Sequence, residues 1–184
     1  MRYILIFFLL FYVLTSSSSQ ENDTIFWTSQ VRLKWNDFNF NIADTCYKQG
    51  AEVMTHSSID TKGFWDKGLP NYQITVCFLR SLSCTIDTLS QFALEHEQLH
   101  FDIAELYARK MRQTVKSLRF KHEKNFNVYS SSFKNIDAEQ EQYQDRYDLE
   151  THHGNMVIKQ KEWIKKVKGE MDKLKLYSSD NILK

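Results

Sequence analysis

The sequence predicts an α+β fold, in which a small antiparallel N-terminal sheet packs on one long helix and two further C-terminal helices. Between Ile25 and about Leu79, short runs of alternating apolar and polar residues are broken by turn residues, as in strands. From Thr85 onward no glycine or proline occurs until Gly154, which favours helices. A chain of 184 residues, 42% of them hydrophobic, is long enough for one domain with its own core.

The first nineteen residues have the composition of a secretory signal peptide. Arg2 precedes an apolar run, Tyr3 to Leu14, which is followed by the small polar residues Ser16 to Ser19. This run has about a dozen residues, whereas a helix that spans a bilayer needs about twenty, so cleavage is favoured over an uncleaved anchor. We expect residues 1–19 to be removed and residues 20–184 to form a single secreted or periplasmic domain.

The charge balance of the chain argues against highly charged partners. Its 24 basic and 23 acidic residues leave a formal net charge of +1. Such a chain has no electrostatic reason to bind nucleic acid or a membrane surface. We therefore expect no nucleic-acid partner and, once the signal peptide is removed, no membrane partner.

The three cysteines allow at most one internal disulfide, which would persist in an exported protein. Cys77 and Cys84 flank a short segment and would be joined if that segment turns back. No CxxC pair is present, so the cysteines do not predict a zinc knuckle.

Three segments before residue 80 are strand candidates. Residues 31–35 alternate apolar and basic side chains, and Asn36 and Asp37 then favour a turn. Residues 51–57 form a weaker candidate. Residues 72–78 alternate more clearly, after a turn signal at residues 68–71.

Three helices are expected in the second half of the chain. The first begins after Thr85 or Asp87 and runs to about Arg119, and residues 125–135 are expected to form a loop. The second helix, about residues 137–150, is acidic, and the third, about residues 155–176, is rich in lysine. Both charged faces are expected to be solvated, although opposite charges would also favour antiparallel packing of the pair.

The string Glu95-His96-Glu97-Gln98-Leu99-His100 lies in the first predicted helix. Residues four apart on a helix lie about 40° apart and one turn above each other, so His96 and His100 can bind one Zn²⁺ ion. Glu97 is rotated about 100° from His96, where a general base for a water at the metal belongs. The alternative is an exposed helix face with two histidines and acids in salt bridges.

The acids after the string are poorly placed to be ligands. Glu105 lies about 180° and Asp102 about 240° around the helix from His96, so both point away from the ion. At most, one of them would orient an imidazole from outside.

A third ligand is better sought in Thr151-His152-His153-Gly154, between the second and third helices. An adjacent histidine pair at a helix junction can aim one imidazole inward, and Gly154 permits a tight turn. These residues alone leave both His152 and His153 as candidates. The remaining two histidines are expected at the surface or in packing contacts: His56 and His122.

The string from His96 to Glu105, the later Thr151-x-His153-Gly154 and the early Trp35-x-Asp37-Phe38 resemble a family known as domain of unknown function 922. Its members, mostly bacterial exported proteins, are described as predicted secreted zinc-dependent proteases. The resemblance extends from about Trp27 to Trp163, and it implies a zincin-like fold with His153 as the third ligand. Ser83-Cys84 stands where the family has Ser-Trp, so this chain departs from the family pattern there.

We therefore expect a secreted zinc metallopeptidase of the HExxH type that acts on a peptide or protein substrate. Its ligands would be His96, His100 and His153, and its general base Glu97. Tyr143 or Tyr147 could assist at the oxyanion, although packing is the commoner role of such aromatic residues. The alternatives are a non-catalytic zinc-binding envelope or surface domain, with a closed four-ligand site, and an interaction module without metal.

Overall fold

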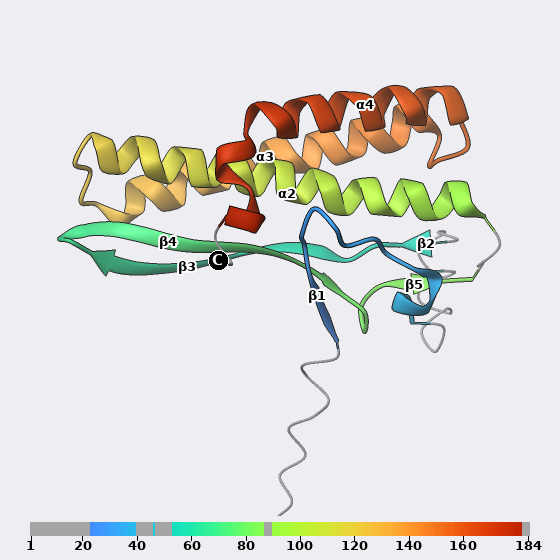
Figure 1. The fold of residues 1–184 in the computed structure, drawn as a ribbon, viewed down its shortest axis with the longest axis horizontal. Coiled ribbons are helices and arrows are strands. Elements are labelled where there is room, and N and C mark those ends of the chain that lie inside the picture. The colour runs from blue at the N-terminus through green and yellow to red at the C-terminus, as the bar shows by residue number, and fades with distance from the viewer. Residues whose placement is uncertain (1–22, 40–45, 47–52, 87–89, 182–184) are drawn as a thin grey trace, which may run out of the picture.

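The computed structural model describes residues 23–39, 46, 53–86 and 90–181. The predicted signal peptide, residues 1–19, lies outside this part of the chain. The described part is α+β, as predicted: a small antiparallel sheet lies against the long helix α2 (Gln91–Phe120), and α3 (Phe126–Thr151) and α4 (Val157–Lys173) pack beside α2, with the start of α3 also against β4 (Figure 1). Within these residues, no helix is both long enough and apolar enough to cross a membrane.

Two sheets are formed by five strands of the described chain. The larger has the order β1 (Thr24–Phe26), β4 (Leu69–Leu79), β3 (Ser57–Asp66), all antiparallel, and the smaller pairs β2 (Val53–Met54) with β5 (Cys84–Thr85). Lys67 and Gly68, with φ of 52° and 75°, make the two-residue turn between β3 and β4. Positive φ at both positions matches the twist of a hairpin.

The strand predicted at residues 72–78 is confirmed as part of β4, but the one predicted at residues 31–35 is wrong. Trp35–Asp37 forms a short 3-10 helix, η1, and no strand precedes it in residues 27–34. The backbone N–H of Leu33 instead donates to Oε1 of Gln98 on α2, 2.8 Å away, and the Leu33 side chain is buried. The alternation therefore reflects one side chain buried beneath a loop, not strand pairing.

The helix boundaries differ from those expected in two places. Helix α2 begins after Ser90, whose Oγ accepts a hydrogen bond from the N–H of Ala93, whereas Thr85 belongs to β5. Asp87 lies outside the described residues. Residues 126–135 are the start of α3, not a loop, because Tyr129 and Phe133, one turn apart, pack their rings on Tyr72 of β4.

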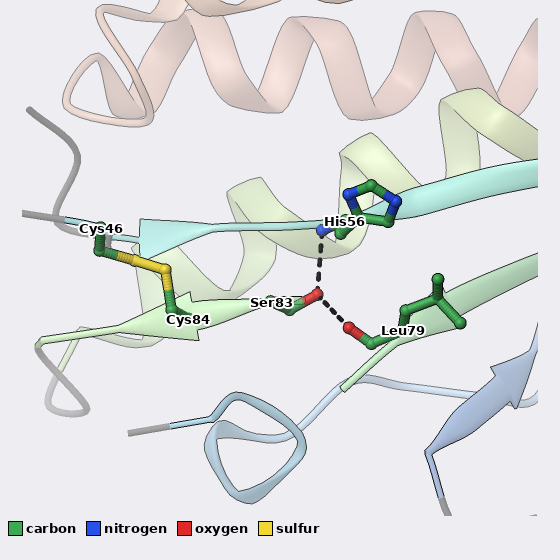
Figure 2. Close-up of a disulfide and its surroundings, with 5 residues drawn as sticks. All are labelled: Cys46, His56, Leu79, Ser83 and Cys84. Carbon is green, nitrogen blue, oxygen red and sulfur yellow. Dashed lines mark hydrogen bonds between the residues drawn. A yellow bond between two sulfur atoms is a disulfide. The ribbon is translucent and has the colours of Figure 1, made fainter. Parts of the chain in front are cut away.

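The described residues contain one disulfide, and it joins Cys46 to Cys84, so the predicted Cys77–Cys84 pairing is wrong (Figure 2). The Ser83 hydroxyl donates a hydrogen bond to the carbonyl of Leu79 and accepts one from the N–H of His56. These two bonds fix the path of the chain between β4 and β5. Cys84 thereby leaves the neighbourhood of Cys77. Cys77 is a buried free thiol, and its Sγ lies 3.1 Å from Oγ of Ser58.

The core has two parts that meet at α2. The first lies between the sheet, α2 and the start of α3, and the second lies among the three helices. Because α2 contributes buried residues to both, its orientation is held from both sides. The largest buried side chains in the second part are aromatic: Tyr107, Tyr143, Tyr147 and Trp163.

Candidate metal centre

Helix α2 places His96 and His100 one turn apart on the face that packs against α3. Their Nε2 atoms lie 3.1 Å apart, and both side chains are largely buried. Asp148 of α3 completes the group, because its Oδ1 lies 3.0 Å from Nε2 of His96 and 2.9 Å from Nε2 of His100. Three side-chain donors therefore converge on one point, the arrangement that a metal ion requires.

Gln144 fixes the orientation of the His100 ring. The Nδ1 atom of His100 lies 2.6 Å from Oε1 of Gln144, whose Nε2 in turn donates to the backbone carbonyl of His100 at 3.1 Å. An amide oxygen can only accept, so Nδ1 carries the proton, and in the neutral ring Nε2 keeps its lone pair toward Asp148. This is the tautomer that a metal ligand needs, held by an outer partner.

Tyr147 orients the His96 ring by stacking instead. The two ring centroids lie 4.5 Å apart at an interplanar angle of 23°, and the Tyr147 hydroxyl donates to the His96 carbonyl at 3.3 Å. Nδ1 of His96 is buried without a partner among the described residues. Tyr147 and Tyr143, whose hydroxyl donates to Glu170, both have packing roles in this structure.

The negative charge and the lone pairs of His96, His100 and Asp148 favour a cation, either a proton or a metal ion, at the point where they meet. Burial acts to lower the pKa of His100, but the hydrogen bond that its protonated ring donates to Asp148 and the negative charges of Glu97 and Asp148 raise it overall. Burial acts to raise the pKa of Asp148, yet the hydrogen bonds that its carboxylate accepts from His100 and His96 bring its pKa well below its usual value. A carboxylate and two imidazole lone pairs within 3.1 Å repel one another unless a proton or a metal ion lies between them.

Glu97 lies beside this group but forms no hydrogen bond with it. The residue is only 6% exposed, and no described residue donates a hydrogen bond to its carboxylate. Burial raises the pKa of Tyr147, and the negative charge of Glu97 raises it further. The same charge helps to raise the pKa of His100, so Glu97 lies near both rings. Its carboxylate is therefore available to a proton-bearing group at the centre.

His153 is near the centre but is not part of the convergent group. Its Nδ1 lies 3.9 Å from Oδ2 of Asp148, and its side chain is 79% exposed. His152 is exposed as well, so the structure brings neither histidine against His96 and His100. The role of His153 as a ligand stays a prediction.

Sequence reasoning missed Asp148, which it counted among the acids of a solvated face. A signal was available: Gln144 and Asp148 are four residues apart and flank Tyr147, which lies on the buried stripe of α3. Polar residues at that spacing beside a buried aromatic ring face the same neighbour as the ring does.

Gly154 lies close against the side chain of His96. The residues His152, His153 and Gly154 have φ of 49°, 52° and 82°, so the chain turns sharply after α3. A Cβ on Gly154 would lie 3.0 Å from Cβ of His96. The Thr151 hydroxyl accepts the N–H of Gly154 at 3.3 Å, which stabilises this turn.

Replacing Gly154 by alanine is expected to lower the free energy of unfolding by about 2 kcal/mol, because positive φ and the close contact with His96 both oppose a Cβ. The melting temperature should fall by about 4–8 °C. Gly169→Ala is the matched control: a Cβ there meets nothing within 4 Å on helix α4, so this change should be neutral or stabilising. Equal stability of the two variants would show that the turn tolerates a side chain.

The remaining polar residues of the string from His96 to Glu105 hold residues 27–33 and the C-terminal segment to α2. Gln98 accepts the N–H of Leu33 and donates to Oδ1 of Asp102, which also accepts the indole N–H of Trp27 at 2.8 Å. Glu105 is fully buried and paired with two arginines. As expected from their angles, neither acid reaches the metal centre, and among the described residues neither hydrogen-bonds an imidazole.

The early Trp35-x-Asp37-Phe38 motif is also structural. The Asp37 carboxylate accepts the N–H of Lys34 and pairs with Arg80 at 2.9 Å, and Phe38 packs edge-on against Phe78. These contacts hold η1 against the end of β4.

A family described as "Bacterial protein of unknown function (DUF922)" matches residues 19–154, which include α2, α3 and the turn at Gly154. No curated protein and no solved structure matches the chain. The matched range covers well over half of the sequence and contains all of His96, Glu97, His100 and Asp148. The chain therefore belongs to the DUF922 family of bacterial proteins of unknown function.

Proposed function

We propose that this protein is an exported, zincin-like zinc peptidase of the HExxH type, with a peptide or protein as its substrate. The observation that supports it most is the meeting of His96, His100 and Asp148 on one point, beside the carboxylate of Glu97, to which no described residue donates a hydrogen bond. A signal peptide at residues 1–19 and export to the periplasm or exterior belong to the same proposal.

Zinc suits the three donors better than other common ions. Tetrahedral zinc has bonds of about 2.0–2.2 Å, which set neighbouring ligand atoms about 3.3–3.6 Å apart. The donors here lie 2.9–3.1 Å apart, so shifts of a few tenths of an ångström would admit the ion. Calcium and magnesium prefer all-oxygen sites, whereas two imidazoles and one carboxylate are a common zinc set.

Glu97 would act as the general base. A bound zinc ion with an open position lowers the pKa of a water and polarises a carbonyl. A carboxylate oxygen of Glu97 would accept the proton of the attacking water and pass it to the leaving amine. Gln144 and Tyr147 would keep both rings in place during this transfer, since they contact His100 and His96 directly.

A second candidate function, a non-catalytic zinc-binding domain, is favoured by the position of His153. Its Nδ1 lies 3.9 Å from Oδ2 of Asp148, and its exposed side chain has room to turn. Rotation of that side chain toward the ion would add a fourth ligand and close the site. A closed site holds zinc for stability and leaves no position for water.

The Glu97→Gln variant tests the catalytic proposal. It should keep one zinc ion per chain, measured by elemental mass spectrometry, and lose hydrolysis of denatured casein or a quenched peptide library by at least about 100-fold. Glu95→Gln is the matched control, because Glu95 is the exposed neighbour of the string. Undiminished hydrolysis by Glu97→Gln would remove that residue from its role, and a zinc-loaded wild-type protein without any hydrolysis would favour the closed site.

A further inference from the structure

One end of the molecule is built from two turns that lie together. The β3–β4 hairpin turn and the turn from α2 to α3 are at the same end in Figure 1. Arg119 joins them, since it donates to the carbonyl of Pro70 at 2.7 Å and to the carboxylate of Asp66 at 2.6 Å. Trp65 packs edge-on against Phe126, with ring centroids 5.1 Å apart. We call these two turns, residues 62–70 and 119–128, the hairpin end.

Aromatic side chains on the hairpin end are unusually exposed. Phe120 is 85% exposed, Trp65 60% and Phe64 44%. A single exposed apolar residue needs no explanation, but three aromatic rings on two adjacent turns expose apolar surface that a soluble protein normally buries or uses.

The hairpin end is also positively charged. Within residues 62–70 and 119–128 there are five basic and two acidic side chains, so this small surface carries +3 while the whole chain carries only +1. One of the acids, Asp66, is paired with Arg119. The exposed cations are all lysines: Lys62, Lys67, Lys121 and Lys124.

We propose that the hairpin end is a docking surface for an anionic phospholipid bilayer. Tryptophan and phenylalanine favour the headgroup region, where their apolar rings leave water, and lysines beside them are attracted to anionic lipid. The sequence-based expectation of no membrane partner rests on the net charge of the whole chain, and the charge and apolar surface gathered on this end depart from that average. This proposal is independent of the metal centre.

The shape and composition of this end favour a bilayer over a macromolecular partner. A stable protein interface needs about 800 Å² on each side, whereas two turns at the tip of an elongated molecule are narrow and would enter a soft surface (Figure 1). A nucleic-acid duplex, whose bases are already stacked inside it, would account for the lysines but not for the exposed rings of Phe64 and Phe120.

Docking by the hairpin end would hold the metal centre away from the lipid. His100 and Phe120 are twenty residues apart on the single helix α2, which corresponds to about 30 Å. The centre would therefore face the aqueous phase, where a soluble peptide or protein segment can reach it.

Sedimentation of the purified protein with lipid vesicles tests the proposal. We expect binding to vesicles of phosphatidylcholine with 30% phosphatidylglycerol, weakening as salt is raised, and at least about tenfold weaker binding to pure phosphatidylcholine. Tryptophan emission should shift to shorter wavelength on binding, and Trp65→Phe should remove that shift. Trp27 and Trp163 are already buried, and the half-buried Trp35 lies in η1, at the end of β4 remote from the hairpin turn. Absence of binding to the anionic vesicles would overturn the proposal.

Matched variants separate this surface from the rest of the molecule. Lys121→Gln with Lys124→Gln should weaken binding about 25-fold, at about fivefold for each charge. The control pair, Lys161→Gln with Lys165→Gln on α4, should leave it within twofold. An equal loss in both pairs would mean that net charge alone drives binding, and the site would be withdrawn.

A second comparison tests the rings and a protein partner. Phe120→Ser should weaken vesicle binding at least fivefold, whereas Leu149→Ser, at a residue that is 73% exposed on α3, should not. Light scattering without lipid should show a monomer for both. Self-association that Phe120→Ser abolishes would make the hairpin end an interface between copies of the chain and would refute lipid docking.

Discussion

Glu105→Ala is expected to lower the free energy of unfolding by about 3–5 kcal/mol, the largest stability change among the variants considered. The Glu105 side chain is fully buried, and its carboxylate accepts hydrogen bonds from Arg109, Arg112 and Ser179. Both arginines are at least nine-tenths buried. Removal of the carboxylate would leave their positive charges buried without the anion that compensates them.

The effect should extend to the C-terminal segment. Arg109 and Arg112 also donate to the carbonyls of Met171 and Tyr177, and Ser179 binds Glu105 through both its N–H and its hydroxyl. Loss of Glu105 should therefore loosen residues 174–181 as well as lower overall stability.

Denaturant unfolding measures the free energy, and hydrogen exchange of residues 174–181 measures the local effect. Glu162→Ala is the control, because Glu162 forms an exposed ion pair with Lys159 on α4 and its loss should leave stability unchanged. A Glu105→Ala protein within 1 kcal/mol of the wild type would show that the buried arginines find other compensation.

Asp148→Asn is expected to weaken zinc binding by at least about 100-fold, because a charged ligand becomes a neutral amide of the same size. Oδ1 of Asp148 is within 3.0 Å of both imidazole nitrogens, which no other described acidic side chain matches. Asp145→Asn, at an exposed position of the same helix, is the control and should leave zinc affinity unchanged. Competition with a chromogenic chelator measures both.

The same assay tests whether His153 is a zinc ligand. If Asp148 is the third ligand and the site is open, His153→Ala should change zinc affinity by less than tenfold. A loss in His153→Ala that equals or exceeds the loss in Asp148→Asn would show that the exposed imidazole turns toward the ion. That result would favour the closed, non-catalytic centre.

The fold class was predictable from periodicity, whereas several elements were not. The strand at residues 72–78 has a buried side chain at alternate positions, so the sequence there shows a clear alternation of apolar residues. Strand β3 was missed because most of its residues from Asp60 to Trp65 are exposed and carry no apolar alternation. The start of α3 resembles a loop in composition, and only its packing on Tyr72 explains the helix.

Local spacing by itself determined the pair of imidazoles and the adjacent carboxylate, because one helical turn sets the positions of His96, Glu97 and His100 whatever surrounds them. The partner on the other helix was decided only by tertiary structure. Asp148 reaches the pair because α3 packs against α2 and Gly154 lets the chain turn beside His96. The disulfide and the charged hairpin end have the same origin, since each joins residues whose proximity depends on how the elements pack and not on their order in the chain.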